Sequence, residues 1–392
     1  MFKKTYILFF SPLLTISCAS VSNDKKIIIW NSWIPDEFKK ESNEFINSLN
    51  NKINLLKDKE GLRNLGKIKF EFRSNSNEVI YQNTISNKYE TDIAIVPYRV
   101  FKNLDFDNLD FKVIAQTATK SFSWAYNDNS LYNDDSFRNI TNSYNNLLNS
   151  LKPYSEWNKD YGYKDSVYND FYKQEVSSTY RGQIIISGDQ QTLNSIKNAW
   201  NNKDLDKFLN FGLIFKNKKS SGSYKLQRAL LAKHFEKSLQ EIEEKLEPIL
   251  NELILIKNPG EFLGKSVNET GLKRMYHIAF TDHGVFNWSK SENDLFKPKT
   301  GSKLQILSVT NPAPYSVMIA KKDLDDKLIN LIKKVFSDLK VKENIYGKFT
   351  GYNKFIPIDL STFETLLNNY NYSETNVGNY QSPSKLLKYE ND

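Results

Sequence analysis

The alternation of apolar and polar residues along the chain predicts short strands, each followed by a polar turn and an amphipathic helix. Apolar strands are expected at 27–30, 67–72, 91–96, 111–115, 183–186, 211–215, 277–280, 304–309 and 316–320. Helices are expected at 78–86, 190–200, 225–234 and 323–336, with helical segments continuing to about residue 256 and again after residue 336. Strands that alternate with helices in this way indicate an α/β fold.

Residues 126–178 interrupt this pattern. Their composition shifts to Asn, Asp, Tyr and Ser with weak periodicity, which predicts a surface insertion containing short helices. We expect no ligand chemistry in this segment.

The N-terminus predicts export and lipidation. Lys3 and Lys4 precede the apolar run 6–14, which is shorter than the roughly 20 residues needed to span a bilayer and is typical of a signal peptide. Ser17 is followed by Cys18, the only cysteine of the chain, so no intramolecular disulfide can form. We expect removal of residues 1–17 and a diacyl lipid on Cys18, which would hold the protein on the extracellular face of the cell membrane.

The charge and the reactive residues narrow the class of function. The formal charge of +8 comes from 54 basic and 46 acidic residues that are interspersed over a Lys- and Asn-rich chain. A nucleic-acid site needs basic residues gathered into one stripe, so we do not expect such a partner. Three histidines and one lipidated cysteine leave little for a metal cluster or a catalytic pair, so no enzyme, metal or catalytic cofactor is expected.

One turn is a candidate anion site. Ser220, Ser221, Gly222 and Ser223 lie between the strand at 211–215 and the helix at 225–234. Backbone N–H groups at the start of a helix can bind phosphate, although a single serine that caps the helix would look similar.

The order of these parts resembles the phosphonate-type substrate-binding proteins of ABC transporters. The matching segments are 27–32, 92–97, Thr179-Tyr180-Arg181, 220–223 and Asn311-Pro312-Ala313-Pro314. Within that group the chain is most similar to the mycoplasmal Cypl-type high-affinity transport lipoproteins, which bind thiamine pyrophosphate. That similarity lies in 180–182, 196–204, 210–212, 277–280, 309–315 and 346–353.

This resemblance implies a type II periplasmic-binding-protein fold, in which two α/β lobes close by a hinge motion around a ligand. Residues 18–118 and 316–392 would form lobe I, and 119–315 would form lobe II, with 126–178 as a family-specific insertion. The crossings are expected near 116–123 and 309–315. The implied partners are an ABC permease and its ATPase, and a monomer is expected.

The resemblance also suggests how thiamine pyrophosphate would be held. The diphosphate would be bound by Thr119, Ser121, Arg181, Ser220, Ser221 and Ser223. The rings would lie against Trp33, Tyr180, Phe286, Trp288 and Tyr315, and Asp282 would contact the aminopyrimidine or the cation. Ser32 and Asn311 complete the expected set. The alternatives are core packing for each aromatic residue, a helix cap for Asp282 and a surface ion pair for Arg181.

Two other functions remain open from the sequence. The same fold could bind a phosphonate, a phosphate ester or a nucleotide. A wide aromatic cleft would favour the thiamine compounds over a small phosphonate, which needs no walls for ring stacking. A surface adhesin that uses 126–178 as its contact surface is the alternative from another class.

Overall fold

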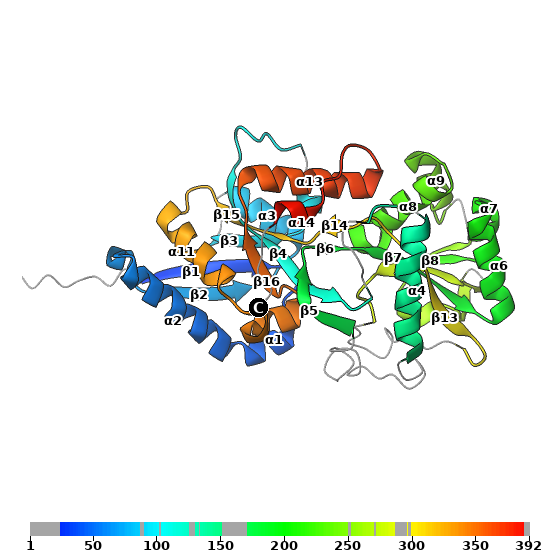
Figure 1. The fold of residues 1–392 in the computed structure, drawn as a ribbon, viewed down its shortest axis with the longest axis horizontal. Helices are drawn as coiled ribbons and strands as arrows, with labels where there is room; N and C mark the ends of the chain where they lie inside the picture. Colours follow the sequence, from blue (N-terminus) through cyan, green and yellow to red (C-terminus); the bar gives the residue numbers. More distant parts are fainter. Residues whose placement is uncertain are drawn as a thin grey trace, which may run out of the picture.

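Two β-sheets covered by helices form the two lobes of the protein, as Figure 1 shows. The computed structural model describes residues 24–86, 90–101, 103–124, 130–132, 134–150, 171–249, 252–269, 272–286, 296 and 299–387. The predicted signal segment 1–17 and Cys18 lie outside these residues. The α/β architecture predicted from the sequence pattern is confirmed.

The first sheet has seven strands within the described residues, in the order β16-β4-β15-β3-β1-β2 with β5 paired to β4. Their bounds are β1 (Lys25–Asn31), β2 (Ile68–Arg73), β3 (Ile93–Val96), β4 (Phe111–Phe122), β5 (Tyr172–Ser177), β15 (Val317–Lys321) and β16 (Lys354–Pro357). β2, β1 and β3 are parallel, and β15 runs antiparallel between β3 and β4. The central strand β3 is buried along its whole length, as its continuous apolar sequence requires.

Helices cover both faces of this sheet. One face packs against α1 (Asp36–Glu41), α2 (Asn43–Lys59), α11 (Asp326–Ser337) and α12 (Ile345–Thr350). The other face packs against α3 (Asn77–Ser86) and α13 (Leu360–Thr375), and α14 (Pro383–Leu386) follows. In Figure 1 α13 extends from the first lobe toward the second, where it contacts α8 (Leu226–His234).

The second sheet repeats the topology of the first. Its five strands within the described chain are ordered β13-β7-β12-β8-β9, with bounds β7 (Gly182–Gly188), β8 (Leu213–Phe215), β9 (Ile254–Ile256), β12 (Ile278–Asp282) and β13 (Lys303–Val309). β9, β8 and β12 are parallel, and β7 runs antiparallel between β12 and β13. Each sheet therefore places one antiparallel strand, β15 or β7, where the chain arrives from the other lobe.

The second lobe has its own helices and a small hairpin. The helices are α4 (Asp134–Ser150), α6 (Gln190–Asn201), α7 (Leu205–Leu209), α8, α9 (Leu239–Lys245) and α10 (Pro259–Phe262), and β10 (Ser266–Glu269) pairs with β11 (Leu272–Met275).

Three sequence-based expectations differ from the structure. Helical segments do not continue to residue 256, because 254–256 is the edge strand β9. The segment 126–178 is more than a surface insertion, because α4 buries Phe137 and Tyr144 in the core of the second lobe and β5 joins the first sheet. The C-terminal region contains β16 as well as helices. The buried residues of α4, Phe137, Ile140, Tyr144 and Leu148, recur every three or four residues as in a helix, but the frequent Asn and Ser residues between them obscured this spacing in the sequence.

Asparagine side chains occupy the backbone hydrogen-bonding groups of two edge strands. In β2, Asn54 of α2 accepts from Ile68 N–H at 2.9 Å and donates to its carbonyl at 2.7 Å, and Asn50 accepts from Phe70 N–H at 2.7 Å. In β13, Asn145 of α4 makes the same pair of bonds to Ile306, at 2.8 and 2.9 Å. A side-chain amide thus replaces a neighbouring strand at each edge.

We expect Asn54→Ala to destabilise the protein by about 1–3 kcal/mol, because it leaves the N–H and C=O of Ile68 without their partner. The exposed Asn51→Ala on the same helix is the control, since it makes the same change in helix propensity. Urea denaturation measures both variants. Equal unfolding midpoints for the two variants would contradict a role in capping β2.

Candidate ligand-binding site

Two of the connections between the lobes, the one before β7 and the one before β15, meet in a short antiparallel pair. β6 (Thr179–Tyr180) pairs with β14 (Ala313–Pro314), with Tyr180 opposite Ala313. The ring of Tyr180 lies 5.2 Å from that of Tyr315 at an interplanar angle of 44°. Both rings are half-buried, so this pair presents aromatic surface between the lobes where the sequence predicts a ligand wall.

His283 and Arg181 lie next to the Tyr180–Tyr315 pair and bond to each other and to Tyr315. The Arg181 N–H donates to His283 Nδ1 at 3.2 Å, so the neutral ring carries its proton on Nε2, which lies 3.3 Å from the Tyr315 hydroxyl. Burial, with the nearby Arg181 charge, holds the pKa of His283 well below its usual value. His283 is therefore a neutral group that orients Tyr315.

The predicted role of Arg181 as a diphosphate ligand needs correction. Its side chain is 3% exposed, and its guanidinium donates to the carbonyls of Thr310 at 2.6 Å and Ser130 at 2.8 Å. These bonds join the second crossing to the segment before α4. Arg181 thus stabilises the connection between the lobes and is turned toward main-chain oxygens.

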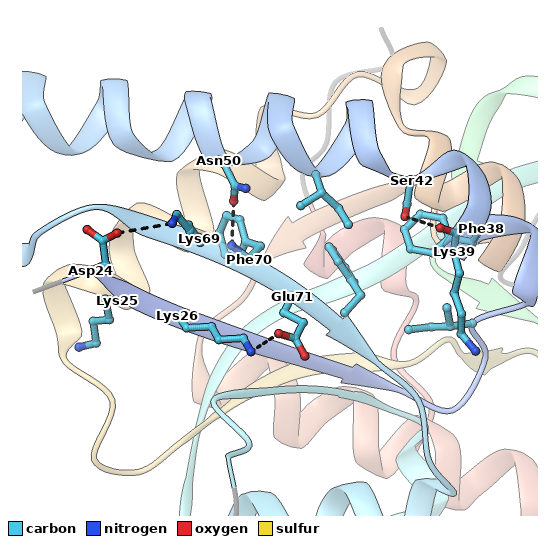
Figure 2. A pocket seen from close by; sticks show the side chains of 13 residues that line it. Asp24, Lys25, Lys26, Phe38, Lys39, Ser42, Asn50, Lys69, Phe70 and Glu71 are labelled. Atoms are coloured by element: carbon cyan, nitrogen blue, oxygen red, sulfur yellow. Dashed lines mark hydrogen bonds and ion pairs between the residues drawn. The ribbon is translucent and has the colours of Figure 1, made fainter.

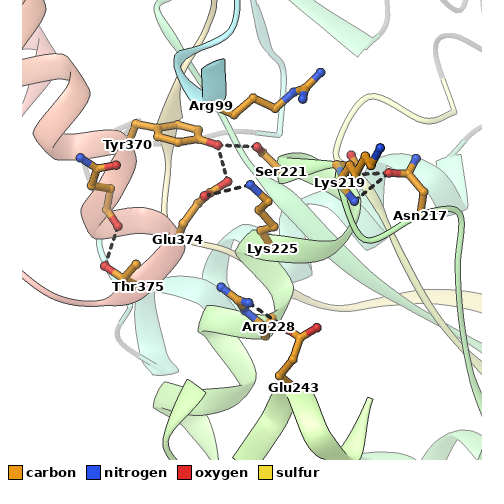
Figure 3. Close-up of polar contacts among 12 residues, drawn as sticks. Arg99, Asn217, Lys219, Ser221, Lys225, Arg228, Glu243, Tyr370, Glu374 and Thr375 are labelled. Carbon is orange, nitrogen blue, oxygen red and sulfur yellow. Dashed lines mark hydrogen bonds and ion pairs between the residues drawn. The ribbon is translucent and has the colours of Figure 1, made fainter. Parts of the chain in front are cut away.

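The serine turn begins a helix, as predicted, but its hydroxyls bond within the protein. Ser220 caps η4 (Ser221–Lys225) by accepting from the Ser223 N–H at 3.2 Å and from the Ser223 hydroxyl at 2.7 Å. The Ser221 hydroxyl lies 2.6 Å from that of Tyr370 on α13, and Tyr370 donates to Glu374 (Figure 3). Ser221 must therefore donate to Tyr370.

Asp282 ends β12 beside this turn. Its side chain is solvent-accessible, yet the protein atoms around it desolvate the carboxyl and raise its pKa to about 6. The carboxylate lies so close to Gly222 that a Cβ atom there would overlap it, and the same Cβ would be 3.2 Å from the Tyr180 ring. Gly222 is held in place by Gln227, whose Nε2 donates to its carbonyl at 2.7 Å. A carboxyl with a raised pKa at a strand end is typical of a functional site.

Four of the predicted ligand-binding residues, Ser32, Trp33, Thr119 and Ser121, lie on strands of the first sheet or directly after them. Trp33 follows β1 and is 51% exposed, and Ser32 donates to Asn77 at the start of α3 at 2.8 Å. Thr119 is buried and donates to Asn353 at 3.1 Å, so its hydroxyl has a structural partner. Ser121 is half-buried in the part of β4 where the pairing with β5 is irregular.

Two further expectations are corrected and one lies outside the described residues. Phe286 is 1% exposed in the core of the second lobe, 5.2 Å from Phe296, so its ring packs rather than forming a ligand wall. Asn311 is 6% exposed and accepts from the Tyr132 N–H at 2.6 Å, which is a structural bond of the crossing. Trp288 lies outside the described residues.

Residues of α13 at this site were missed by the sequence reasoning. Tyr370 and Glu374 lie four residues apart, hence on one face of the helix, and Glu374 is 3.5 Å from Lys225 of η4 (Figure 3). Tyr352 was also missed; it is half-buried, and its hydroxyl lies 2.8 Å from that of Ser316. The sequence shows only that Tyr370 and Glu374 are four residues apart, and this spacing is too common in helices to indicate a site.

A separate cavity of about 560 Å³ lies between α1, α2 and the β1–β2 edge of the first lobe, as Figure 2 shows. Its floor is apolar, with Phe38 and Phe70 among the lining residues. Two of its four lysines are paired with acidic residues of the lining, Lys69 with Asp24 at 3.4 Å and Lys26 with Glu71. None of the lining residues belongs to the crossings, so this cavity is separate from the site between the lobes.

None of the helices in the described residues is both long enough and apolar enough to cross a membrane. The same residues hold no group of three or more side chains suited to a metal ion.

A model of the CypI family, described as extracytoplasmic thiamine-binding lipoprotein, matches residues 43–367. The chain belongs to the CypI family. The matched range contains Tyr180, Ser221, Asp282 and Tyr315, and it ends just before Tyr370. Members of the CypI family are binding proteins of transport systems rather than enzymes, so this chain is a substrate-binding protein of such a system.

Named relatives agree with this membership. The high affinity transport system protein p37 of Mesomycoplasma hyorhinis is 30% identical over 304 residues, covering 69% of this chain and 73% of the relative. The protein of the same name from Mycoplasma pneumoniae is 27% identical over 288 residues, covering 68% and 72%. The solved structure of Mycoplasma hyorhinis Mh-p37 matches with a TM-score of 0.74 and 27% identity over 88% of this chain and 99% of that one. The type II periplasmic-binding-protein fold expected for the CypI chain is thereby confirmed.

We expect Asp282→Asn to raise the thermal unfolding midpoint of the ligand-free protein at about pH 7.5. The folded-state pKa of about 6 lies above the ordinary value of 3.8, so the fold disfavours the ionised carboxyl at any pH above that range. The gain should shrink as the pH falls from about 6 toward 4 and vanish only below about pH 3, where the carboxyl is protonated in both the folded and the unfolded state. Calorimetric scans of Asp282→Asn and of the exposed control Asp107→Asn test this prediction. An equal rise of the unfolding midpoint at about pH 7.5 and at about pH 3 would refute it.

Proposed function

We propose that this protein is the lipid-anchored solute-binding protein of an ABC importer and that it takes thiamine pyrophosphate or thiamine between its two lobes. The observation that carries the proposal is the match of residues 43–367 to a family described as thiamine-binding. The relative Mh-p37, for which transport of thiamine pyrophosphate has been suggested, supports the same ligand.

The arrangement of the described residues suits a ligand with flat rings. Tyr180 and Tyr315 form a half-buried pair at the crossing, and Trp33 exposes its indole at the end of β1. An aromatic face can stack on a ring and attract a cation by about 0.5–2 kcal/mol. Asp282 adds the acceptor that an amino group or a cation requires. A small phosphonate needs no such walls, so the thiamine compounds remain the better candidates.

The proposed ligand contacts are Ser32, Trp33, Ser121, Tyr180, Asp282 and Tyr315, with the backbone of the serine turn at 220–223 nearby. Thr119, Arg181, Phe286 and Asn311 are excluded from this set by the structural partners and burial described above. A role of 126–178 as an adhesin surface is not favoured, because α4 is committed to the core of the second lobe.

Isothermal titration of the purified protein should show saturable heat with thiamine or thiamine pyrophosphate and none with methylphosphonate. Trp33→Ala should weaken binding by about 1–2 kcal/mol without changing the melting temperature, because the side chain is 51% exposed. Leu55→Ala, at a residue 63% exposed on α2, is the control. Absence of heat with both thiamine compounds would defeat the proposal, whereas unchanged affinity of Trp33→Ala would only remove Trp33 from the site.

The anchor is tested independently of the ligand. Cys18→Ser in the bacterial host should move the protein from the membrane fraction to the medium or to an uncleaved precursor, because no other cysteine can carry the lipid. Mass spectrometry of the wild-type mature N-terminus should find a diacylglyceryl group on Cys18. An unmodified thiol there would contradict the anchor and leave the binding function intact.

A further inference from the structure

Two acidic side chains and one basic side chain influence Tyr180 electrostatically. Asp282 and Glu374 add to the burial that raises the pKa of Tyr180, while Arg99 opposes them. Glu374 is paired with Lys225 at 3.5 Å, and Arg99 also has an acidic partner. Among the described residues none forms an ion pair with Asp282, and the charge of Lys216 offsets only part of the burial that raises the pKa of this carboxyl.

The position of Asp282 favours a cation as its partner. The carboxylate lies against the backbone of Gly222, and the Tyr180 ring approaches the same point. The carboxylate is exposed to solvent and has no ion-pair partner among the described residues, so a cation that binds against it and the Tyr180 ring gains electrostatic attraction. We name this place, formed by Asp282, Gly222 and Tyr180, the Asp282 corner.

The adjoining serine turn is poorly suited to a diphosphate. The hydroxyl of Ser223 donates to Ser220, the Ser223 N–H is capped by Ser220, and the Ser221 hydroxyl donates to Tyr370. A diphosphate at the turn would also lie next to the Asp282 carboxylate, and like charges repel. Binding of an anion through the serine hydroxyls would therefore break existing bonds and meet the negative charge of Asp282.

We infer that the Asp282 corner binds the positively charged ring of the ligand and that Asp282 is the residue that selects for this charge. The inference rests on the proposed function, because it assigns the part of a thiamine compound that this place recognises. It reverses the orientation expected from the serine turn, since the diphosphate is turned away from residues 220–223. The phenol face of Tyr180 supplies the second attraction to the cation.

Calorimetric titrations at about pH 7.5 separate the two orientations. Asp282→Asn should weaken thiamine and thiamine pyrophosphate by the same factor, at least about tenfold, because both carry the cation. Ser221→Ala should change either affinity by less than about threefold, and inorganic diphosphate should not displace thiamine. Asp107→Asn, an exposed change of the same type, is the control.

Each opposite result has a definite meaning. If Asp282→Asn leaves thiamine affinity unchanged or tightens thiamine pyrophosphate, or if inorganic diphosphate displaces thiamine, the inference is overturned while the proposed function stands. If the wild-type protein binds neither thiamine compound, both fall together. The melting temperature of Asp282→Asn, expected to be at or above that of wild type, shows that a loss of binding is not a loss of folding.

A pH series distinguishes charge recognition from a structural effect. The groups that face Asp282 are Tyr180 of β6 and Lys216 of the loop after β8, with the neutral His283 next to it in the chain. Protonation of the carboxyl removes its charge, so the ratio of wild-type to Asp282→Asn affinity for thiamine should fall toward one as the pH is lowered through about 6. A ratio that is constant from about pH 5 to pH 8 would overturn the inference.

Discussion

The pairing of β6 with β14 is the constraint on which the region between the lobes depends. These strands hold two of the chain crossings side by side, and the hydrogen bonds of Arg181 to Thr310 and Ser130 fasten them to the second lobe. Because these two crossings are paired, we expect the lobes to open and close by bending near this pair. Tyr180 and Tyr315 would then lie close to the hinge, and a ring bound there would keep its contacts as the lobes move.

The C-terminal helix limits this motion in a second way. α13 belongs to the first lobe by packing, yet Tyr370 bonds to Ser221 and Asn376, at the end of the helix, donates to the Ala229 carbonyl at 2.8 Å in the second lobe. Leu226 of α8 is buried in a cluster of the first lobe. Rotation of the lobes would have to preserve or break these contacts, so we expect α13 to limit how far the lobes can open.

The sequence predicted the parts of the fold that depend on local patterns. Strands such as β3 and β7 were found because fully buried strands read as apolar runs, and the helix start at Ser220 was found because its cap chemistry is local. The use of the Ser221 hydroxyl could not be predicted, because its partner Tyr370 is 149 residues away. Arg181 was misassigned for the same reason, since its partners are carbonyl groups, which every residue carries.

The position of Asp282 at the end of a strand could be predicted from the sequence, but the raised pKa of its carboxyl could not. Desolvation depends on which residues approach from other elements, here Gly222 and Tyr180, and no spacing in the sequence encodes that approach. The same limit explains Phe286. It follows the same strand as Asp282 by only four residues, yet it turns into the core.

Asparagine, which is frequent in this chain, closes the edges of both sheets. Asn50, Asn54 and Asn145 occupy backbone groups of β2 and β13 that would otherwise be open to an extended segment of another molecule. Proteins that stand close together on one cell surface meet their neighbours edge to edge at high local concentration, where open strands pair into aggregates. A side-chain amide at each edge leaves fewer backbone groups open to such pairing, without an additional strand and without a change in net charge.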